Sequence, residues 1–220
     1  MKIPSGTEVF DKLLEGGYDG DVITTIYGPA ATGKTTACLL AAIEVAKNGG
    51  KVIFVDTENG FSVERLKQLT KDYKKILDNV FLIKVASFEE QDEKIFSIFN
   101  LIKKTRVGLV IVDTIGAHYR NVLQSNVKRI NDMMADQLRI LTEIARDFNT
   151  AVIFTNQVYG IPGTNRINIV GGDMLRSYSG CLIELKKFKA SNRGAILKKH
   201  KSLGEKEIVF KIVEKGFTLL

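Results

Sequence analysis

The 220-residue sequence contains no run of about 18 apolar residues, and its start lacks the apolar segment that signal peptides carry. It has only two cysteines and two histidines, and none of them stands at the spacing of metal ligands. It shows no internal repeat and no low-complexity segment. These absences argue against a membrane protein, a disulfide scaffold, a zinc protein and a repeat array. They predict a cytoplasmic protein that has no membrane partner.

The length and the composition are those of a soluble globular protein. Hydrophobic residues make up 45% of the chain and charged residues 26%, so a sizeable core can be buried. A chain of this length suits one large α/β domain, and no linker interrupts it, so residues 1–220 are predicted to form a single domain. Cys38 and Cys181 lie in apolar runs, and we expect both to be small buried side chains.

The charge is unevenly distributed along the chain. The formal net charge is +7, yet residues 1–60 contain eight acidic side chains against five lysines. Residues 184–220 contain ten Lys and Arg against four acidic residues. A basic C-terminal part suggests a polyanion as partner, although a solvated lysine-rich face explains the same charge, and charge alone does not decide between them.

One stretch fits a chemical motif in full. Residues 28–35 read Gly-Pro-Ala-Ala-Thr-Gly-Lys-Thr, which is the pattern G-x-x-x-x-G-K-[ST] of a phosphate-binding loop (P-loop). An apolar, β-branched run at 22–27 predicts a strand before it, and residues 36–47 predict a helix after it, ended by two glycines. The alternative is a glycine turn that binds nothing. Such a turn would need neither the full motif nor a strand before it and a helix after it.

Each part of this motif has a role in holding a nucleotide. Gly28 and Gly33 let backbone N–H groups turn toward phosphate oxygens, and the start of the following helix adds partial positive charge. Lys34 can contact the β- and γ-phosphates, and the Thr35 hydroxyl can bind Mg²⁺. The predicted nucleotide-binding residues are Gly28, Pro29, Ala30, Ala31, Thr32, Gly33, Lys34, Thr35 and Thr36.

The chain up to residue 158 alternates strands and helices. Strands are predicted at 51–56, 80–85, 108–113 and 150–155, and helices near 10–14, at 62–73, 87–104 and 130–148, with a polar loop at 116–127. This alternation predicts a mostly parallel central sheet flanked by helices. After a loop at 159–172, four shorter strands are predicted near 179–185, 194–200, 206–213 and 217–219, linked tightly enough to pair antiparallel. The predicted fold class is therefore α/β.

Three polar residues follow predicted parallel strands, whose ends share one edge of the sheet. Asp113 ends an apolar strand and would hold Mg²⁺ beside Thr35. Glu58 would orient and deprotonate the attacking water, and Gln157 would bond the γ-phosphate and pass its presence to the next loop. With Lys34 these two form the predicted catalytic set. The alternatives are an ordinary loop acid for Glu58 and an ordinary polar residue for Gln157.

Several of these segments together resemble a known family. Asp56-Thr57-Glu58 followed by Phe61 and Glu64-Arg65-Leu66, and Thr155-Asn156-Gln157-Val158, are similar to the strand motifs of RecA-like recombinases of the archaeal and eukaryotic type. Gly171-Gly172-Asp173-Met174-Leu175 resembles their second-loop signature, and residues 3–17 resemble their entry into the ATPase core. The resemblance runs from Ile3 to Leu220, and it implies a RecA-like P-loop NTPase core that binds ATP and Mg²⁺.

The departures from a full recombinase narrow the resemblance. A full recombinase carries an N-terminal DNA-binding domain and an aromatic hook that links subunits into filaments, whereas this sequence begins at the core. The loop at 159–172 is short, and the basic cluster at 198–201 is unusual for a recombinase. This combination resembles RadB, a family of archaeal recombinase paralogues. That resemblance implies a weak ATPase that binds DNA and assists homologous recombination and DNA repair without performing strand exchange.

The resemblance also suggests partners. It implies sequence-tolerant binding of single- or double-stranded DNA, with the archaeal recombinase and a Holliday-junction resolvase as candidate protein partners and a homodimer as an open alternative to the monomer. In RecA-like proteins the loops at 116–127 and 159–172 line the DNA path. A KaiC-like signalling ATPase acting on proteins, and a nucleotide-gated scaffold with incidental hydrolysis, remain the competing hypotheses.

The predicted DNA-binding residues fall into two groups. Four belong to the two loops or to the helix that follows the first of them: Arg120, Lys128, Arg129 and Arg166. Four belong to the basic tail cluster: Lys198, Lys199, His200 and Lys201. In a continuous strand Lys199 and Lys201 would share one face, and His200 would be solvated or would face phosphate, as would His118.

Overall fold

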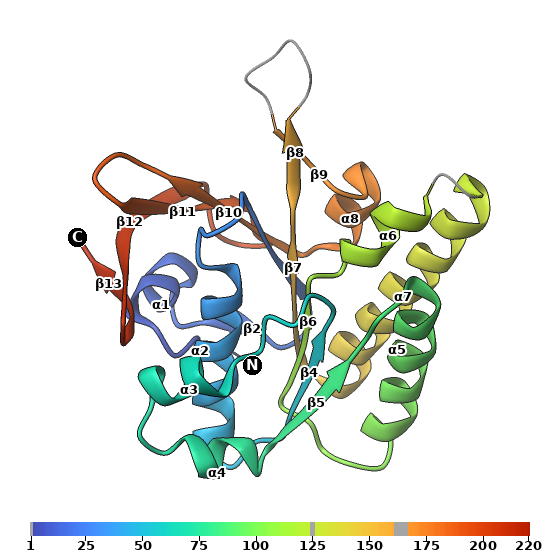
Figure 1. The fold of residues 1–220 in the computed structure, drawn as a ribbon, viewed down its shortest axis with the longest axis horizontal. Coiled ribbons are helices and arrows are strands. Elements are labelled where there is room, and N and C mark those ends of the chain that lie inside the picture. The colour runs from blue at the N-terminus through green and yellow to red at the C-terminus, as the bar shows by residue number, and fades with distance from the viewer. Residues whose placement is uncertain (1, 124–125, 161–166) are drawn as a thin grey trace.

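The computed structural model describes residues 2–123, 126–160 and 167–220, and its centre is a sheet of nine strands (Figure 1). The strand order is β13-β12-β11-β10-β3-β7-β6-β4-β5. The bounds are β3 Ile23–Tyr27, β4 Val52–Asp56, β5 Val80–Lys84, β6 Leu109–Asp113, β7 Ala151–Asn156, β10 Cys181–Lys187, β11 Asn192–Lys199, β12 Lys206–Val213 and β13 Gly216–Leu219.

The sheet has a parallel part and an antiparallel part. Strands β10, β3, β7, β6, β4 and β5 run parallel, while β11, β12 and β13 continue the sheet as antiparallel strands. The predicted α/β fold with antiparallel C-terminal strands is confirmed. One detail was wrong: β10, the first of the four C-terminal strands, pairs parallel with β3. The segment before β10 is long enough to carry the chain back across the sheet.

Helices cover both faces of the sheet (Figure 1). Side chains alternate along the strands, so that Val52 and Phe54 of β4 face one core, and Ile53 and Val55 face the other. The first core packs against α1 to α4 and the second against α5 to α8. The bounds are α1 Glu8–Leu14, α2 Lys34–Lys47, α3 Val63–Leu69, α4 Tyr73–Leu77, α5 Phe88–Ile102, α6 Ala117–Val122, α7 Val127–Phe148 and α8 Gly172–Tyr178.

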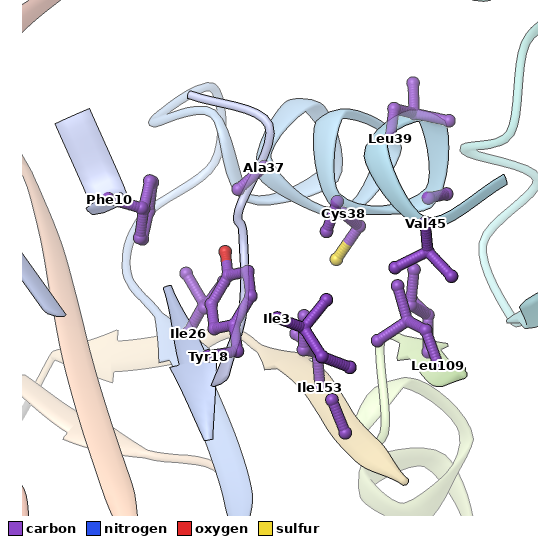
Figure 2. Close-up of a cluster of buried hydrophobic side chains, with 14 of the residues drawn as sticks. Ile3, Phe10, Tyr18, Ile26, Ala37, Cys38, Leu39, Val45, Leu109 and Ile153 are labelled. Carbon is purple, nitrogen blue, oxygen red and sulfur yellow. The ribbon is translucent and has the colours of Figure 1, made fainter. Parts of the chain in front are cut away.

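The first core is built around α2, the helix that follows the phosphate-binding motif (Figure 2). Ala37, Cys38 and Leu39 of this helix pack over Ile26 of β3 and Ile153 of β7. Cys38 and Cys181 are both free and buried, as predicted. The start of α2 is therefore held firmly against the centre of the sheet.

Several short elements differ from the expectation. The helix predicted at 62–73 is two helices, α3 and α4, because Thr70 has an extended backbone that ends α3. The loop predicted at 116–127 contains α6, and α8 was not expected. The loop predicted at 159–172 begins and ends in a small antiparallel pair, β8 (Val158–Gly160) and β9 (Ile167–Ile169). A second pair joins β1 (Lys2–Ile3) and β2 (Tyr18–Asp19). Such short elements depend on tertiary contacts that local propensity does not encode.

None of the helices in the described ranges combines the length and the apolar character that crossing a bilayer requires.

Candidate functional site

The phosphate-binding motif forms the turn between β3 and α2, and close packing explains both of its glycines. Gly28 and Gly33 have φ values of 155° and 103°. A Cβ at Gly28 would meet the carbonyl oxygen of Leu185 at 2.3 Å, and one at Gly33 would meet the ring of Phe217 at 3.0 Å. The C-terminal strands thus press against the outside of the loop, which sequence reasoning did not anticipate.

Side chains within the motif hold its own carbonyl groups. Thr32 Oγ1 donates to the Pro29 carbonyl at 2.8 Å, and Lys34 Nζ donates to the carbonyls of Gly28 and Pro29 at 2.8 and 3.0 Å. Burial lowers the pKa of Lys34, and the nearby carboxylates of Asp113 and Glu58 oppose that shift. A bound phosphate would replace the two carbonyls as the acceptor of Lys34, and its charge would favour the ammonium form.

The predicted catalytic residues and the motif share one cavity of about 370 Å³. It lies at the carboxyl edge of the parallel strands, where the chain leaves β3, β4, β6 and β7. Its lining residues are Ala30, Ala31, Gly33, Lys34, Thr35, Thr36, Glu58, Thr114 and Gln157. Residues that are far apart in the sequence therefore meet at one place.

Thr35 lines this cavity, and the Asp113 carboxylate lies close to it on the same side of Gly60. The Asp113 carboxylate is 3% exposed and accepts a hydrogen bond from the Thr155 hydroxyl. Burial raises the pKa of Asp113, while hydrogen bonds from Thr155 and Thr35 lower it. A Cβ at Gly60 would lie 3.5 Å from Asp113 Oδ2 and 3.6 Å from Thr35 Oγ1, so the glycine leaves space beside both oxygens.

This donor set fits Mg²⁺, which binds one or two protein oxygens and completes its shell with phosphate and water. Among the described residues there is no group of three or more His, Cys, Asp and Glu side chains that could enclose a metal by itself. A site of this kind can hold the ion only together with further oxygen ligands such as those of a nucleotide.

Glu58 and Gln157 contact each other across the cavity. Gln157 Nε2 donates to Glu58 Oε1 at 2.6 Å. The Gln157 carbonyl accepts a hydrogen bond from Val170 N at 3.2 Å, and Asn156 Nδ2 donates to the Val170 carbonyl at 2.7 Å. The end of β7 is thereby joined by two hydrogen bonds to the residue that follows β9.

Asp56 is a site residue that sequence reasoning did not assign. It is 1% exposed, and its two carboxylate oxygens accept from the amides of Gly60 and Phe61 at 2.9 and 3.1 Å. These bonds fold the loop that carries Glu58 and Gly60 toward the cavity. The Asn59-Gly60 pair signals a turn at this place in the sequence, but no local pattern assigns Asp56 as the side chain that holds it.

The loop group of predicted DNA-binding residues lies near the carboxyl edge of the sheet. Arg120 is exposed on α6, and Lys128 and Arg129 are exposed in the first turn of α7. Helix α6, the start of α7 and the β8–β9 pair are found at one end of the molecule (Figure 1). Arg166 lies outside the described residues. Arg176 on α8, which was not predicted, is exposed and donates to Asn168 Oδ1 at 3.2 Å.

The basic tail cluster has a different structure from the one expected. Strand β11 ends at Lys199, so the predicted alternation through residue 201 is wrong. Lys198 forms an ion pair with Glu205, and Lys199 Nζ donates to the Arg176 carbonyl at 3.1 Å. Lys201 Nζ lies 2.8 Å from Asp21 Oδ1. These ammonium groups already have protein partners.

His200 is a buried residue and is neither solvated nor directed at a phosphate, so that prediction was wrong. Its side chain is 2% exposed, with Nε2 3.1 Å from Asp19 Oδ2. Its Nδ1 accepts from the amides of Ser202 and Leu203 at 3.2 and 3.3 Å, which places the proton of the neutral ring on Nε2. Burial lowers the pKa of His200, although the Asp19 carboxylate raises it. His118 is half-buried, with Nε2 3.1 Å from the Val85 carbonyl.

The tail cluster and the loop group also lie at opposite edges of the sheet. The chain leaves β11 beside Leu182 at the start of β10, because Lys199 is opposite Leu182. β10 runs parallel to β3, so this is the amino edge of the parallel strands. The cavity and the loops are at the carboxyl edge. The tail cluster therefore does not lie along the carboxyl edge, and among the described residues Lys199 approaches the loop region only at the carbonyl of Arg176 on α8.

The mostly parallel sheet, the antiparallel C-terminal strands and the P-loop at the end of β3 define a RecA-like fold. The model of the Rad51 family matches residues 1–219, and the chain belongs to this family.

Relatives described as "DNA repair and recombination protein RadB" are similar over nearly the whole chain, which confirms the resemblance. The relative from Methanobrevibacter smithii is 40% identical over 223 residues, covering 98% of this chain and 94% of the relative. The one from Methanocaldococcus jannaschii is 38% identical, covering 95% and 98%. The one from Methanothermobacter thermautotrophicus is 33% identical, covering 98% and 94%.

Proposed function

We propose that this protein is an ATP-binding and DNA-binding accessory factor of homologous recombination and DNA repair, with weak ATPase activity and no strand exchange of its own. The observation that carries the proposal is the cavity at the carboxyl edge, where the P-loop, Glu58 and Gln157 meet. The names of the RadB relatives, which refer to DNA repair and recombination, support the same role.

In this proposal the amides of residues 28–36 and the Lys34 ammonium bind the phosphates of ATP. Thr35 and Asp113 hold Mg²⁺, which neutralises charge on the phosphate oxygens when it is bound. Glu58 orients the attacking water and accepts its proton, and Lys34 stabilises the charge on the transferred phosphoryl group. The Glu58–Gln157 contact supports this assignment, because it brings the carboxylate and the amide to the same side of the cavity.

The proposed hydrolysis is slow because no arginine is among the described residues that line the cavity. In this chemistry an arginine finger contributes on the order of 10³–10⁵ in rate. In this proposal a second subunit or a partner protein supplies such an arginine, so that binding of the partner regulates the hydrolysis. The candidate partners are the recombinase and a junction-resolving nuclease, and residues 1–220 act as one ATPase core.

DNA binds, in this proposal, at the carboxyl edge through Arg120, Lys128, Arg129 and Arg166. These side chains offer cationic contacts to phosphate, and Tyr159 is the exposed aromatic residue on β8. One aromatic ring provides little base stacking, so binding should tolerate any sequence. The hydrogen bonds that join Val170 to the Gln157 carbonyl and to the Asn156 side-chain amide offer a route by which ATP at the cavity changes the β8–β9 pair.

The test is a mobility-shift series with single-stranded and duplex DNA, with and without ATP, at increasing salt. If about four phosphates are neutralised, log K should fall with log salt at a slope of roughly −3 to −4. A slope near zero would remove DNA as the partner and favour a signalling ATPase of the KaiC type, which acts on proteins.

A further inference from the structure

The hairpin of β10 and β11 lies directly beside the P-loop. Strand β10 pairs with the last residue of β3 at Glu184 and then continues to Lys187. Along this extension the carbonyl of Leu185 is in close contact with the backbone at Gly28. Strand β11 returns antiparallel, with Arg193 opposite Lys187. The hairpin therefore brings two cationic residues next to the outer side of the loop.

Arg193 joins the hairpin turn to the P-loop. Its Nε donates to the Ala31 carbonyl at 3.2 Å, and its Nη1 donates to the carbonyls of Ser191 and Asn192, both at 3.0 Å. Within residues 2–123, 126–160 and 167–220, no carboxylate forms an ion pair with this guanidinium. Three backbone carbonyls are thus its partners, and one of them belongs to the P-loop.

The bond to Ala31 constrains the next amide of the loop. Ala31 has a φ of 59°, a left-handed conformation that costs a non-glycine residue roughly 1–2 kcal/mol. The peptide between Ala31 and Thr32 is trans, so its N–H points away from the side on which its C=O lies. A carbonyl held outward by Arg193 therefore directs the Thr32 N–H toward the inner side, where the cavity lies.

Arg193 does not line the cavity and acts on it through the loop. We propose that Arg193 is a positioning residue of the P-loop, which holds the Ala31 carbonyl outward so that the Thr32 amide is directed at a nucleotide phosphate. The inference rests on the proposed nucleotide binding. It assigns to the C-terminal strands a direct part in phosphate affinity, because β11 carries this residue.

The experiment measures the affinity of Mg²⁺-ADP, Mg²⁺-ATP and adenosine by calorimetric titration for Arg193→Ala, Arg193→Gln and the wild type. Arg193→Ala should weaken ADP and ATP about 10-fold, the loss of one charge-assisted hydrogen bond, and leave adenosine unchanged. Arg193→Gln keeps an N–H donor without the charge and should recover part of the loss. A purely structural role would weaken all three ligands and would not be rescued in this way.

Lys187→Ala is the matched control, because it removes a positive charge from the cross-strand neighbour of Arg193. Among the described residues, the bond from this hairpin's cations to the loop is the one made by Arg193. Lys187→Ala should weaken ADP less than about twofold. An equal loss in Lys187→Ala and Arg193→Ala would overturn the inference in favour of general electrostatic attraction. If Arg193→Ala does not fold, the nucleotide affinities of Arg193→Gln and Arg193→Lys are compared instead. An affinity about 10-fold lower for Arg193→Gln than for Arg193→Lys would overturn the inference, because the positive charge and not the hydrogen bond would then determine the affinity.

The inference and the proposed function fail in different ways. A wild-type protein that binds neither ADP nor ATP contradicts the proposed function. A wild type that binds both, with Lys34→Ala weakened and Arg193→Ala unchanged, contradicts only the role of Arg193.

Discussion

The P-loop and the basic tail cluster at 198–201 are both short, conspicuous stretches of the sequence, but they differ in what surrounds them. The P-loop carbonyls accept hydrogen bonds from Thr32 and Lys34 of the same motif, and the loop borders a cavity that Glu58 and Gln157 also line. The tail cluster contacts Glu205, Asp19 and Asp21, which lie elsewhere in the chain. The P-loop thus keeps the surroundings that the proposed phosphate site requires, whereas the tail cluster has ammonium and imidazole groups that are already paired within the protein.

The largest effect is expected for Lys34→Ala. In the proposed site Lys34 donates charge-assisted hydrogen bonds to phosphate, each worth about 1.5–3 kcal/mol, so ATP affinity should fall by at least about 100-fold. Thermal stability without nucleotide should change little, because the ammonium donates to two carbonyls of its own loop and to no other group among the described residues. Calorimetric titration and a thermal melt measure the two quantities. Unchanged ATP affinity would contradict the assignment of the P-loop as a phosphate-binding site.

Glu58→Gln should separate binding from hydrolysis. Glu58 is exposed and its carboxylate accepts a hydrogen bond from Gln157, so the substitution should leave ATP affinity within about twofold. Loss of the general base should lower the hydrolysis rate by roughly 10²–10⁴-fold. Phosphate release under saturating ATP measures the rate. If ATP binding collapses instead, Glu58 has a structural role in the cavity.

The third prediction compares the two groups of cations directly. Replacing Arg120, Lys128 and Arg129 by Ala should flatten the salt slope of DNA binding by about 2–3, if all three contact phosphate. Replacing Lys199 and Lys201 by Ala should change the slope by less than about 1, because both ammonium groups have protein partners. The measurement is a salt series on both variants with the same DNA. If the Lys199 and Lys201 variant shows the larger change in salt slope, the DNA contact is instead at the amino edge of the sheet.

The smallest effect concerns His200 and pH. Its pKa is lowered in the folded protein by burial, so below about pH 6.5 the unfolded chain binds more protons than the folded one. Stability should therefore begin to fall as the pH drops through about 6.5, and the loss should be complete below the folded pKa. The charged groups facing the ring are Asp19, Lys2 and Lys201.

Urea unfolding between pH 7.5 and 5 tests this prediction. His200→Gln should flatten the pH dependence of the unfolding free energy, whereas His118→Gln, at the second histidine, should leave it unchanged. A wild type whose stability does not vary over this range would show that Asp19 offsets the burial of His200.

Long periodic segments were predictable from the sequence, and short ones were not. The strands of the parallel sheet and helices α5 and α7 have apolar patterns that extend over several turns or a whole strand. Helices α6 and α8 have 6 and 7 residues, and helices this short cannot show a repeating apolar pattern. Thr70 ends α3 through its extended backbone, and nothing in the residues around it required a stop there.

The sequence by itself determined the P-loop, the alternation of strands and helices around it and the acidic and amide residues at the strand ends. Those features depend on local backbone geometry and on the rule that parallel strands end at one edge. Only the tertiary structure decided which cationic side chains already have partners within the protein. It paired Lys201 with Asp21, buried His200 beside Asp19 and brought Arg193 to the Ala31 carbonyl. The bond between Lys201 and Asp21 joins residues 180 positions apart, and the bond between Arg193 and Ala31 joins residues 162 positions apart. No local sequence pattern encodes contacts over such separations.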